Sequence, residues 1–496
     1  MVKALIISKL RLNPKHKIML QSKDINKILE LKSGFTQRWL EPDFILGSLK
    51  NFRFSVLCKY LNPLKVKGYS FEFIFSILIS LGFTGRATIN SVMNSHLSKH
   101  IKAGKDVFYR LKNNPKVAWR LILWMFATKF RKIVETKKDG VKCLILDDTL
   151  IQKTGRYIEK VSRVWDHVSK RSLLGFKLLV LGFWDGTSFI PVDFSYHREK
   201  GDNKEKPFGL KKKELKKQFT KKREKGSFSY EREQETDISK TCIGLKMFLR
   251  AISQGFKADY LLMDSWFTCN AFIDAVLKLK KQTTHLIGIY KIAKSNFEYN
   301  GQKYTYSQLR NKLGKVKRCR KLRLHYKEAV VMHKGKHVKL FFSRQGTNGK
   351  WKTFITTNTS LSFIQMIEIY QIRWSIEVFF KETKQLLGLN KCQSTDFDAQ
   401  IADATITMIQ YILLSLKYRY EKYESKGQLY QKLEESVIEL HLNERLWGLF
   451  IELMQLISKI FKGTDEDELI KTILNDEEIY IQISHLFNPV CKKHAA

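Results

Sequence analysis

The stretch from Ser360 to Gly388 constrains the fold more than any other part of the sequence, because it has the pattern of one long amphipathic helix. On a helical wheel one broad arc is apolar and predicts a core-facing side: Ile369, Ile372, Ile376, Phe379, Leu386 and Leu387. A second arc, about a quarter of the circumference, is polar: Tyr370, Arg373, Glu377, Lys381 and Lys384. A solvated helix face usually alternates its charges. This stripe, with one carboxylate among a phenol, a guanidinium and two ammonium groups, predicts a site for a metal ion and a phosphate.

The charge of the chain indicates a polyanionic partner. Its 496 residues include 89 Lys and Arg against 48 Asp and Glu, for a net charge of +41. Self-repulsion of this size opposes compactness, and nucleic acid is the partner whose phosphates and released counterions would offset it. An anionic membrane is the alternative, but no apolar run reaches the roughly 18–20 residues of a spanning helix, so we expect no membrane association. The first residues lack a signal-peptide pattern, and seven scattered cysteines without CxxC spacing are typical of reduced thiols, so we expect a cytoplasmic protein.

Composition divides the chain into four regions. Residues 1–138 have helical patterns and many basic side chains, which predicts a helical DNA-binding domain with a buried helix over Phe71–Leu81. Residues 139–294 and 359–415 alternate strand and helix patterns, which predicts a mixed α/β core with a hairpin turn at Asp185-Gly186. Residues 295–358 contain short strand-like pieces separated by turns and predict a β-rich insertion, and residues 416–496 predict a helical C-terminal region.

The predicted insertion is strongly basic. Between Gly301 and Lys352 the sequence has 16 Lys or Arg and one acid, Glu328. A solvated face would normally mix the two signs, so this pattern favours a nucleic-acid-binding surface. A second lysine-rich segment, residues 198–225, is interpreted as a solvated loop that also contacts phosphate.

Two aspartates each follow a short apolar run of the buried-strand type. Asp148 follows CLIL, with Asp147 directly before it, and Asp264 follows YLLM. A single strand-end aspartate is more commonly a turn or cap residue. However, the carboxyl ends of buried strands in α/β domains open into the site crevice, and carboxylate oxygens are the ligands that Mg²⁺ prefers. Together with Glu377 and Arg373, these two acids predict metal-dependent phosphoryl transfer.

The residues of the helix and the two strands resemble those of the DDE transposases of bacterial insertion sequences, in the group named for insertion sequence four (IS-four). The signature motif, or mark, of that group is Tyr-x2-Arg-x3-Glu-x6-Lys. In this sequence it is formed by Tyr370, Arg373, Glu377 and Lys384. The family's first aspartate lies in a strand-end Asp-Thr, which matches Asp148-Thr149, and its second matches Asp264 in LLMDSWF. The resemblance covers about residues 140 to 415.

The resemblance implies a fold and an activity. The α/β core would be RNase H-like, with an antiparallel hairpin before parallel strands, a β-rich insertion between the second aspartate and the glutamate, and helical flanking regions. The protein would cut phosphodiester bonds at the ends of the element and join the freed 3′-OH to target DNA. Its partners would be the terminal inverted repeats and target DNA, and a homodimer would pair the two element ends.

The resemblance also implies a role for each site residue. Asp148, Asp264 and Glu377 would be catalytic and would hold two Mg²⁺ ions, for which Mn²⁺ can substitute. Arg373 would grip a phosphate, Tyr370 would donate a hydrogen bond near it, and Lys384 would contact the DNA end. Lys381 joins the DNA-binding set from its place on the helix stripe, although it is outside the family's mark.

Two other functions use the same residues differently. A nuclease of this fold would cut DNA without joining it. A transposase-derived DNA-binding protein would do neither, but it would have no use for three acids beside Arg373.

Overall fold

The computed structural model describes residues 54–64, 68–83, 88–94, 103–134, 140–279, 284–291 and 296–420, together with positions 52, 101, 425, 426, 428–431, 476 and 478. The chain forms two compact units. The larger comprises residues 55–82 and 106–427, and the smaller comprises residues 1–54, 83–105 and 428–496. Much of the predicted helical regions 1–138 and 416–496 lies outside the described residues, so their extent, like the other region boundaries, stays a prediction.

The described chain begins with short helices. They are α4 (Phe54–Leu61), α5 (Phe71–Leu81), α6 (Ile89–Met93), α7 (Lys105–Lys112) and α8 (Trp119–Ile133). The buried helix predicted after Ser70 is confirmed as α5, whose first turn is capped by the Ser70 side chain accepting from the Phe73 N–H. In the larger unit, Phe75 of α5 lies 6.3 Å from the rings of both Trp119 and Phe126 of α8, so the two helices share an aromatic core.

A long helix, α16 (Phe397–Tyr420), passes through the core of the larger unit. No apolar run of spanning length was expected, yet this helix is long and apolar enough to cross a membrane, with a mean hydropathy of 1.3. However, 94% of its apolar window is buried inside the protein, which is the environment of a core helix. Gln410 of α16 donates to the carbonyls of Leu78 and Ile79, at 3.3 and 2.8 Å, and so satisfies acceptors at the end of α5.

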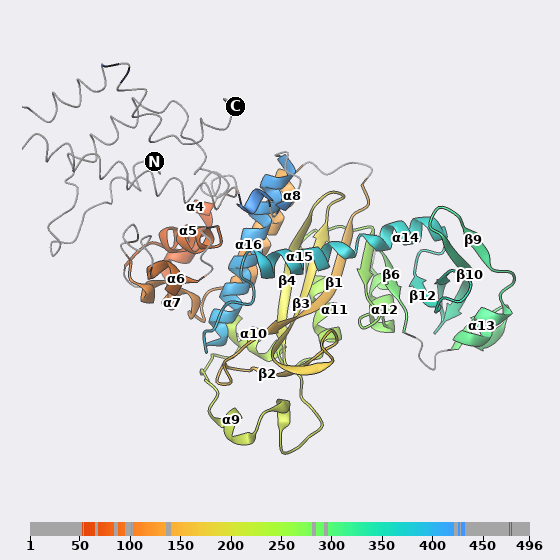
Figure 1. Ribbon diagram of the computed structural model, residues 1–496, viewed down its shortest axis with the longest axis horizontal. Coiled ribbons are helices and arrows are strands. Elements are labelled where there is room, and N and C mark those ends of the chain that lie inside the picture. Colours follow the sequence, from red (N-terminus) through yellow and green to blue (C-terminus); the bar gives the residue numbers. More distant parts are fainter. Residues whose placement is uncertain are drawn as a thin grey trace, which may run out of the picture. The chain divides into compact units, whose positions relative to one another are not determined.

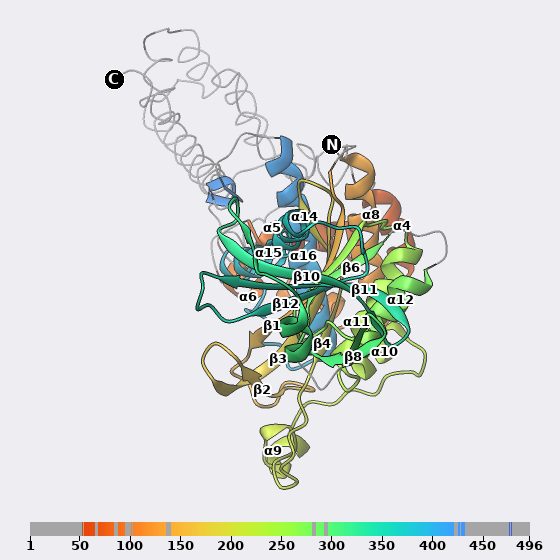
Figure 2. The same ribbon diagram turned by 90° about the vertical axis from the view of Figure 1, so that its right-hand side faces the viewer.

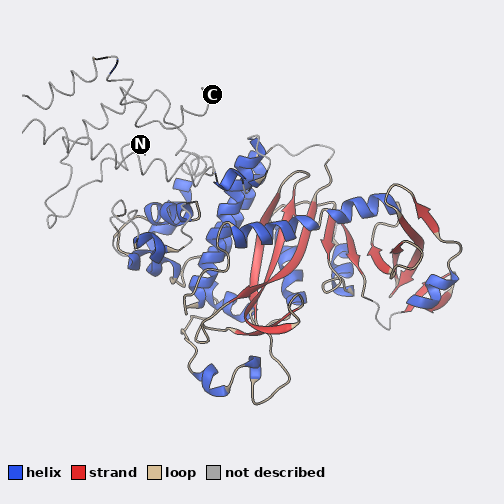
Figure 3. Ribbon diagram, viewed as in Figure 1, coloured by secondary structure: helices blue, strands red, loops and turns tan. Residues whose placement is uncertain are grey.

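The core of the larger unit is built on one mixed sheet, drawn in red in Figure 3. Its first strands are antiparallel: β1 (Cys143–Gln152), β2 (Ser162–Asp166), β3 (Arg171–Trp184) and β4 (Phe189–His197). The predicted Asp185-Gly186 hairpin is confirmed between β3 and β4. Asp185 Oδ1 accepts from the N–H groups of Thr187 and Ser188 at 2.9 and 2.8 Å, and Gly186 takes a φ of 100°.

Two parallel strands and the insertion complete the sheet. β5 (Tyr260–Met263) pairs with β1, and β6 (His285–Ile289) pairs with β5, both in parallel. The basic region then forms β7 (Asn296–Tyr299), β8 (Gln302–Thr305), α13 (Tyr306–Lys312), β9 (Lys317–Cys319), β10 (Leu324–His333), β11 (Lys336–Gln345) and β12 (Lys352–Thr356). Because β12 pairs with β6, the region extends the core sheet instead of forming a separate one.

Helices cover both faces of this sheet (Figures 1 and 2). On one face lie α14 (Phe363–Gln371), α15 (Trp374–Gln385) and α16, and Figure 1 shows α15 crossing in front of β1 and β3. On the other lie α11 (Lys240–Ser253) and α12 (Asn270–Lys278), preceded by α9 (Lys212–Lys216) and α10 (Phe228–Glu235). The predicted α/β class is confirmed, and antiparallel strands followed by parallel ones are consistent with the predicted RNase H-like fold.

The predicted single helix from Ser360 to Gly388 is wrong in one respect, because it is two helices. α14 begins at the Ser362 cap, where Ser362 and Gln365 form a capping box, and α15 ends at Gln385. Between them the N–H groups of Ile372, Arg373 and Ser375 donate to carbonyls three residues back, so one turn tightens to 3₁₀ geometry. The tightened turn contains Arg373, the centre of the polar stripe.

Candidate active site

β5 ends beside the middle of β1 and brings two aspartates together. The parallel register pairs Leu146 with Met263, so Asp147 and Asp264 are the next residues along adjacent strands. Asp264 is held in a turn, because its Oδ1 accepts from the N–H groups of Trp266 and Phe267 at 2.8 and 3.3 Å. Its backbone carbonyl in turn accepts from the Thr268 hydroxyl at 2.6 Å.

Asp147 and Asp148 point to opposite faces of the sheet, because β1 continues to Gln152 instead of ending at the predicted position. Asp147 faces α15 and accepts from Arg373 Nη1 at 2.7 Å. Asp148 faces α11 and is paired with Lys240 Nζ. The acid that contacts Arg373 in this structure is therefore Asp147. The predicted ligand Asp148 lies on the other face of the sheet, and its role stays a prediction.

The polar stripe of α14 and α15 meets β1 and the end of β5. Tyr370 donates its hydroxyl proton to the Met263 carbonyl at 3.3 Å, and Lys384 donates to Thr149 Oγ1 at 2.6 Å. Arg373 donates to Glu377 Oε1 at 2.5 Å as well as to Asp147, so its guanidinium bridges two acids. Lys381 differs, since its side chain is exposed and makes no polar contact with the described strands.

The site carries an excess of buried negative charge. Burial, reinforced by the charge of Asp264, raises the pKa of Asp147 to about 7, although Arg373 opposes the rise. Burial also raises the pKa of Asp264, with the charge of Asp148 acting in the same direction. On the basic side, burial lowers the pKa of Lys384 to about 8. Burial disfavours the Arg373 cation, but Tyr370 and Asp147 hold its pKa above the ordinary value.

These acids suit a divalent cation in their chemistry. Carboxylate oxygens are hard donors of the kind that Mg²⁺ binds, and a cation would offset both the burial and the repulsion that raise the pKa of Asp147 and Asp264. In the described part of the chain, no group of three His, Cys, Asp or Glu side chains is close enough to hold an ion. At this site the Arg373 guanidinium donates to both Asp147 and Glu377. The donors therefore suit a divalent cation by their chemistry, while the arrangement present holds a guanidinium between two of them.

Arg373 also has capacity left for an anion. Its Nε is buried and has no hydrogen-bond partner among the described residues. A buried donor without an acceptor is costly, and a phosphate oxygen would satisfy it.

Comparison with known families agrees with this geometry. Residues 238–413, which contain Asp264 and Glu377, match the family described as the transposase DDE domain. Residues 82–285, which contain Asp147, Asp148 and Asp264, match the DDE superfamily endonuclease family. The matches support a DDE transposase. DDE domains of this type act on DNA and generally use divalent metal ions. No curated protein matches the chain.

The sequence pattern named both neighbouring aspartates and the resemblance selected Asp148, but neither predicted which of the two contacts Arg373. The parallel pairing of β1 with β5 separates the two aspartates, because lateral neighbours in a parallel sheet share a face, but this pairing is visible only in the structure. Thr149 gives the same information, since it lies two residues after Asp147 and contacts Lys384 from the same face. Lys240 and its pairing with Asp148 had no signal in the sequence pattern.

Proposed function

We propose that the protein is the transposase of an insertion sequence of the IS-four type. It cuts phosphodiester bonds at the element ends and joins the freed 3′-OH to target DNA. The observation that carries the proposal is the convergence of Tyr370, Arg373 and Lys384 on β1 and the end of β5, with Glu377 bound to the same Arg373. These are the four residues of the family's mark, and three of them contact the strands that bear the aspartates.

The proposed metal ligands are three carboxylates: Asp264, Glu377 and either Asp147 or Asp148. Two Mg²⁺ ions, or Mn²⁺, held there would activate the attacking oxygen and stabilise the leaving oxygen. Motif comparison selects Asp148 as the third member. Geometry favours Asp147, because it lies on the same face of the sheet as Glu377 and because the like charge of Asp264 repels it.

The basic residues of the stripe handle the DNA in this proposal. Arg373 exchanges its bridge between two acids for a phosphate of the substrate, a change that frees the acids and satisfies Nε. Lys384 holds the DNA end beside Thr149. Lys381, which is exposed one helical turn earlier, contacts the DNA strand. Tyr370 donates to the Met263 carbonyl, and so holds α14 against the end of β5 beside the bound phosphate. A homodimer on paired ends and a cytoplasmic location beside host DNA complete the proposal.

A joining assay tests this function. The protein is incubated with Mg²⁺, DNA carrying the terminal repeats that flank the reading frame, and a target plasmid. Joined products are expected; cut but unjoined DNA would indicate a nuclease, and bound but intact DNA a binding protein. Glu377→Gln should abolish cleavage and leave DNA binding nearly intact, and normal cleavage by this variant would contradict the site assignment.

The same assay separates the neighbouring aspartates. Loss of groups that only support a metal site typically costs about 10- to 100-fold, so loss of a ligand should cost at least ~100-fold. We expect that loss for Asp147→Asn and a smaller one for Asp148→Asn, whose carboxylate faces Lys240. The opposite order would restore Asp148 as the ligand.

A further inference from the structure

A cavity of about 180 Å³ lies at the N-terminus of α8, and α10, α11 and α16 contribute the rest of its wall. The cavity is smaller than the pockets of about 300–1,000 Å³ that enclose organic ligands, but several times larger than the roughly 30 Å³ that one water molecule takes. It therefore has room for a small ion and not for a nucleotide.

The beginning of α8 favours an anion in this cavity. The helix is 15 residues long, its cap residue Ala118 makes no side-chain hydrogen bond, and its first turn contains no acidic residue. Residues 117–121 line the cavity. The first N–H groups of a helix lack acceptors inside the helix and carry partial positive charge, so phosphates commonly bind there. A helix end without a side-chain cap thus opens into the cavity.

Buried donors on the cavity wall lack acceptors. Four side-chain nitrogen atoms that line it have no hydrogen-bond partner among the described residues: Trp119 Nε1, Trp124 Nε1, Arg232 Nε and Arg232 Nη2. The residues Trp119 and Arg232 are only 4% and 5% exposed. No buried acceptor of the described chain that lacks a partner lies on this wall. Because buried donors without acceptors are costly, a ligand that satisfies them must offer acceptors only.

The guanidinium groups beside the cavity outnumber the buried carboxylates that bind them. Asp193 accepts from Arg120 Nε at 3.0 Å and from Arg250 Nη2 at 2.7 Å, and Glu235 lies 3.3 Å from Arg232 Nη1 and 2.7 Å from Arg120 Nη2. Three cations against two anions leave one positive charge uncompensated. In agreement, burial and then the charge of Arg120 lower the pKa of Arg232 to about 10.

Two other acids line the cavity, but neither supplies the missing charge. Asp398 accepts from Lys221, in the lysine-rich segment 198–225, at 2.8 Å, and also from the Ser229 hydroxyl. Glu231 is exposed, so water and salt screen its charge.

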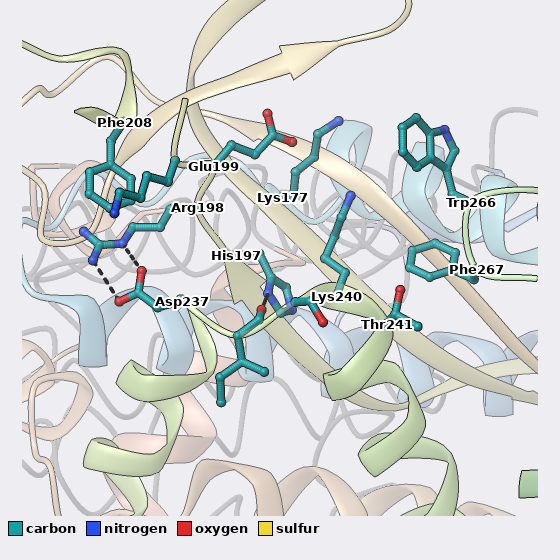
Figure 4. Close-up of a pocket in the computed structure, with 13 residues that line it drawn as sticks. Lys177, His197, Arg198, Glu199, Phe208, Asp237, Lys240, Thr241, Trp266 and Phe267 are labelled. Carbon is teal, nitrogen blue, oxygen red and sulfur yellow. Dashed lines mark hydrogen bonds and ion pairs between the residues drawn. The ribbon is translucent and has the colours of Figure 1, made fainter. Parts of the chain in front are cut away.

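The larger pocket beside the candidate active site, of about 730 Å³, differs in this respect (Figure 4). There Asp237 is paired with Arg198, whose Nη2 lies 2.8 Å from Oδ2, and His197 is held between Ser195 and the Ile238 carbonyl at 2.7 and 3.0 Å. In the described part of the chain, no buried atom that lacks a partner lines that pocket. The unsatisfied donors are thus a property of the cavity at α8.

We infer that the cavity at α8 binds one small oxyanion of the phosphate class. Its oxygens accept from Arg232 Nε and Nη2 and from the two indole N–H groups, and its charge neutralises the arginine cluster. Trp119 and Trp124 belong to α8 and Arg232 to α10, and both helices pack against β4, so the anion joins the two helices. The same chemistry is offered by free phosphate and by a phosphate group of DNA. The inference does not depend on the proposed function.

Equilibrium dialysis of the full chain with radiolabelled inorganic phosphate tests the inference, in chloride buffer at constant ionic strength. Trp124→Phe keeps the ring but deletes one N–H, and should bind one phosphate per chain about tenfold more weakly than the wild type. Arg232→Gln should lose this phosphate. Phosphate should also raise the unfolding temperature of the wild type by about 2 °C for each tenfold rise above its dissociation constant.

A matched control is Trp165→Phe, which deletes the N–H of an indole on β2 outside the cavity and should keep the wild-type affinity. Equal phosphate affinity of the wild type and a folded Trp124→Phe overturns the inference, and this comparison stands even if Arg232→Gln does not fold. A temperature shift no larger than that from chloride at equal ionic strength also overturns it, since water then satisfies the donors.

A second dialysis with saturating duplex DNA in EDTA identifies the source of the phosphate. Displacement of the labelled phosphate that depends on Trp124 supports a DNA phosphate in the cavity. Retention of that phosphate supports the free anion. Both results uphold an oxyanion site at α8.

Discussion

Replacing Asp147 by Asn should make the metal-free protein more stable while it destroys activity. Asp147 has its pKa raised from 3.8 to about 7, mainly by burial and then by Asp264. One pKa unit corresponds to about 1.36 kcal/mol, so the buried charge costs at most ~4 kcal/mol at pH 8. Solvent penetration and relaxation reduce such values, and we expect a gain of ~1–3 kcal/mol for the neutral amide.

The gain should depend on pH in a defined direction. The folded state of the wild type holds the Asp147 proton up to about pH 7, whereas the unfolded chain releases it near pH 3.8. Between these pH values the folded state binds more protons than the unfolded chain. The free energy of unfolding of the wild type, compared with that of Asp147→Asn, therefore falls as the pH rises. The difference in the free energy of unfolding between the two proteins should reach its full size above about pH 7 and disappear toward pH 4.

Urea denaturation in EDTA at several pH values measures this difference. Asp148→Asn is the matched control, because it removes the same charge from the next residue but breaks the ion pair with Lys240, and it should not be stabilised. Adding Mg²⁺ should stabilise the wild type, by about 2.7 kcal/mol at 100 times the dissociation constant, and should stabilise Asp147→Asn much less. An Asp147→Asn protein no more stable than the wild type at pH 8 would refute the account of the site.

Three further predictions concern other contacts. Arg373→Gln should bind Mn²⁺ more tightly than the wild type in the absence of DNA, measured by electron paramagnetic resonance, because the guanidinium no longer bridges Asp147 and Glu377; unchanged affinity would contradict the bridging role. DNA affinity should fall steeply with salt because the chain carries a net charge of +41, and a flat salt response would oppose phosphate-dominated binding. Gly82→Ala should cost ~1–3 kcal/mol in denaturation, since its Cβ would lie 2.5 Å from the Gln410 amide that is anchored on α5, whereas Gly314→Ala, with open space around it, should be nearly neutral.

Local patterns predicted the elements well where one face of an element is buried. Phe71–Leu81 matches α5 residue for residue, and the Asp185-Gly186 turn joins β3 to β4 as expected. Both signals are short-range, because helical spacing and a glycine at positive φ act within a few residues. The helix stripe was equally readable, and Tyr370, Arg373, Glu377 and Lys384 do lie together.

The errors arose where long-range pairing decides. The apolar run before Asp147 predicted a strand that ends there, but β3 pairs with β1 along its whole length to Gln152. The strand therefore continues through both aspartates, and its alternation sends them to different faces. The break between α14 and α15 is similar, since nothing in the spacing of apolar residues marks a 3₁₀ turn at Arg373.

The sequence by itself determined the chemistry of the site: which acids follow the buried apolar runs, and which basic groups share a helix face with Glu377. The physical reason is that side-chain type and helical spacing are local properties of the chain. Only the tertiary structure decided that Asp147 meets Arg373 while Asp148 meets Lys240, and that Trp119 and Arg232 line one cavity. Those choices depend on strand register between segments more than a hundred residues apart, or on the packing of helices against the sheet, and no local pattern encodes them.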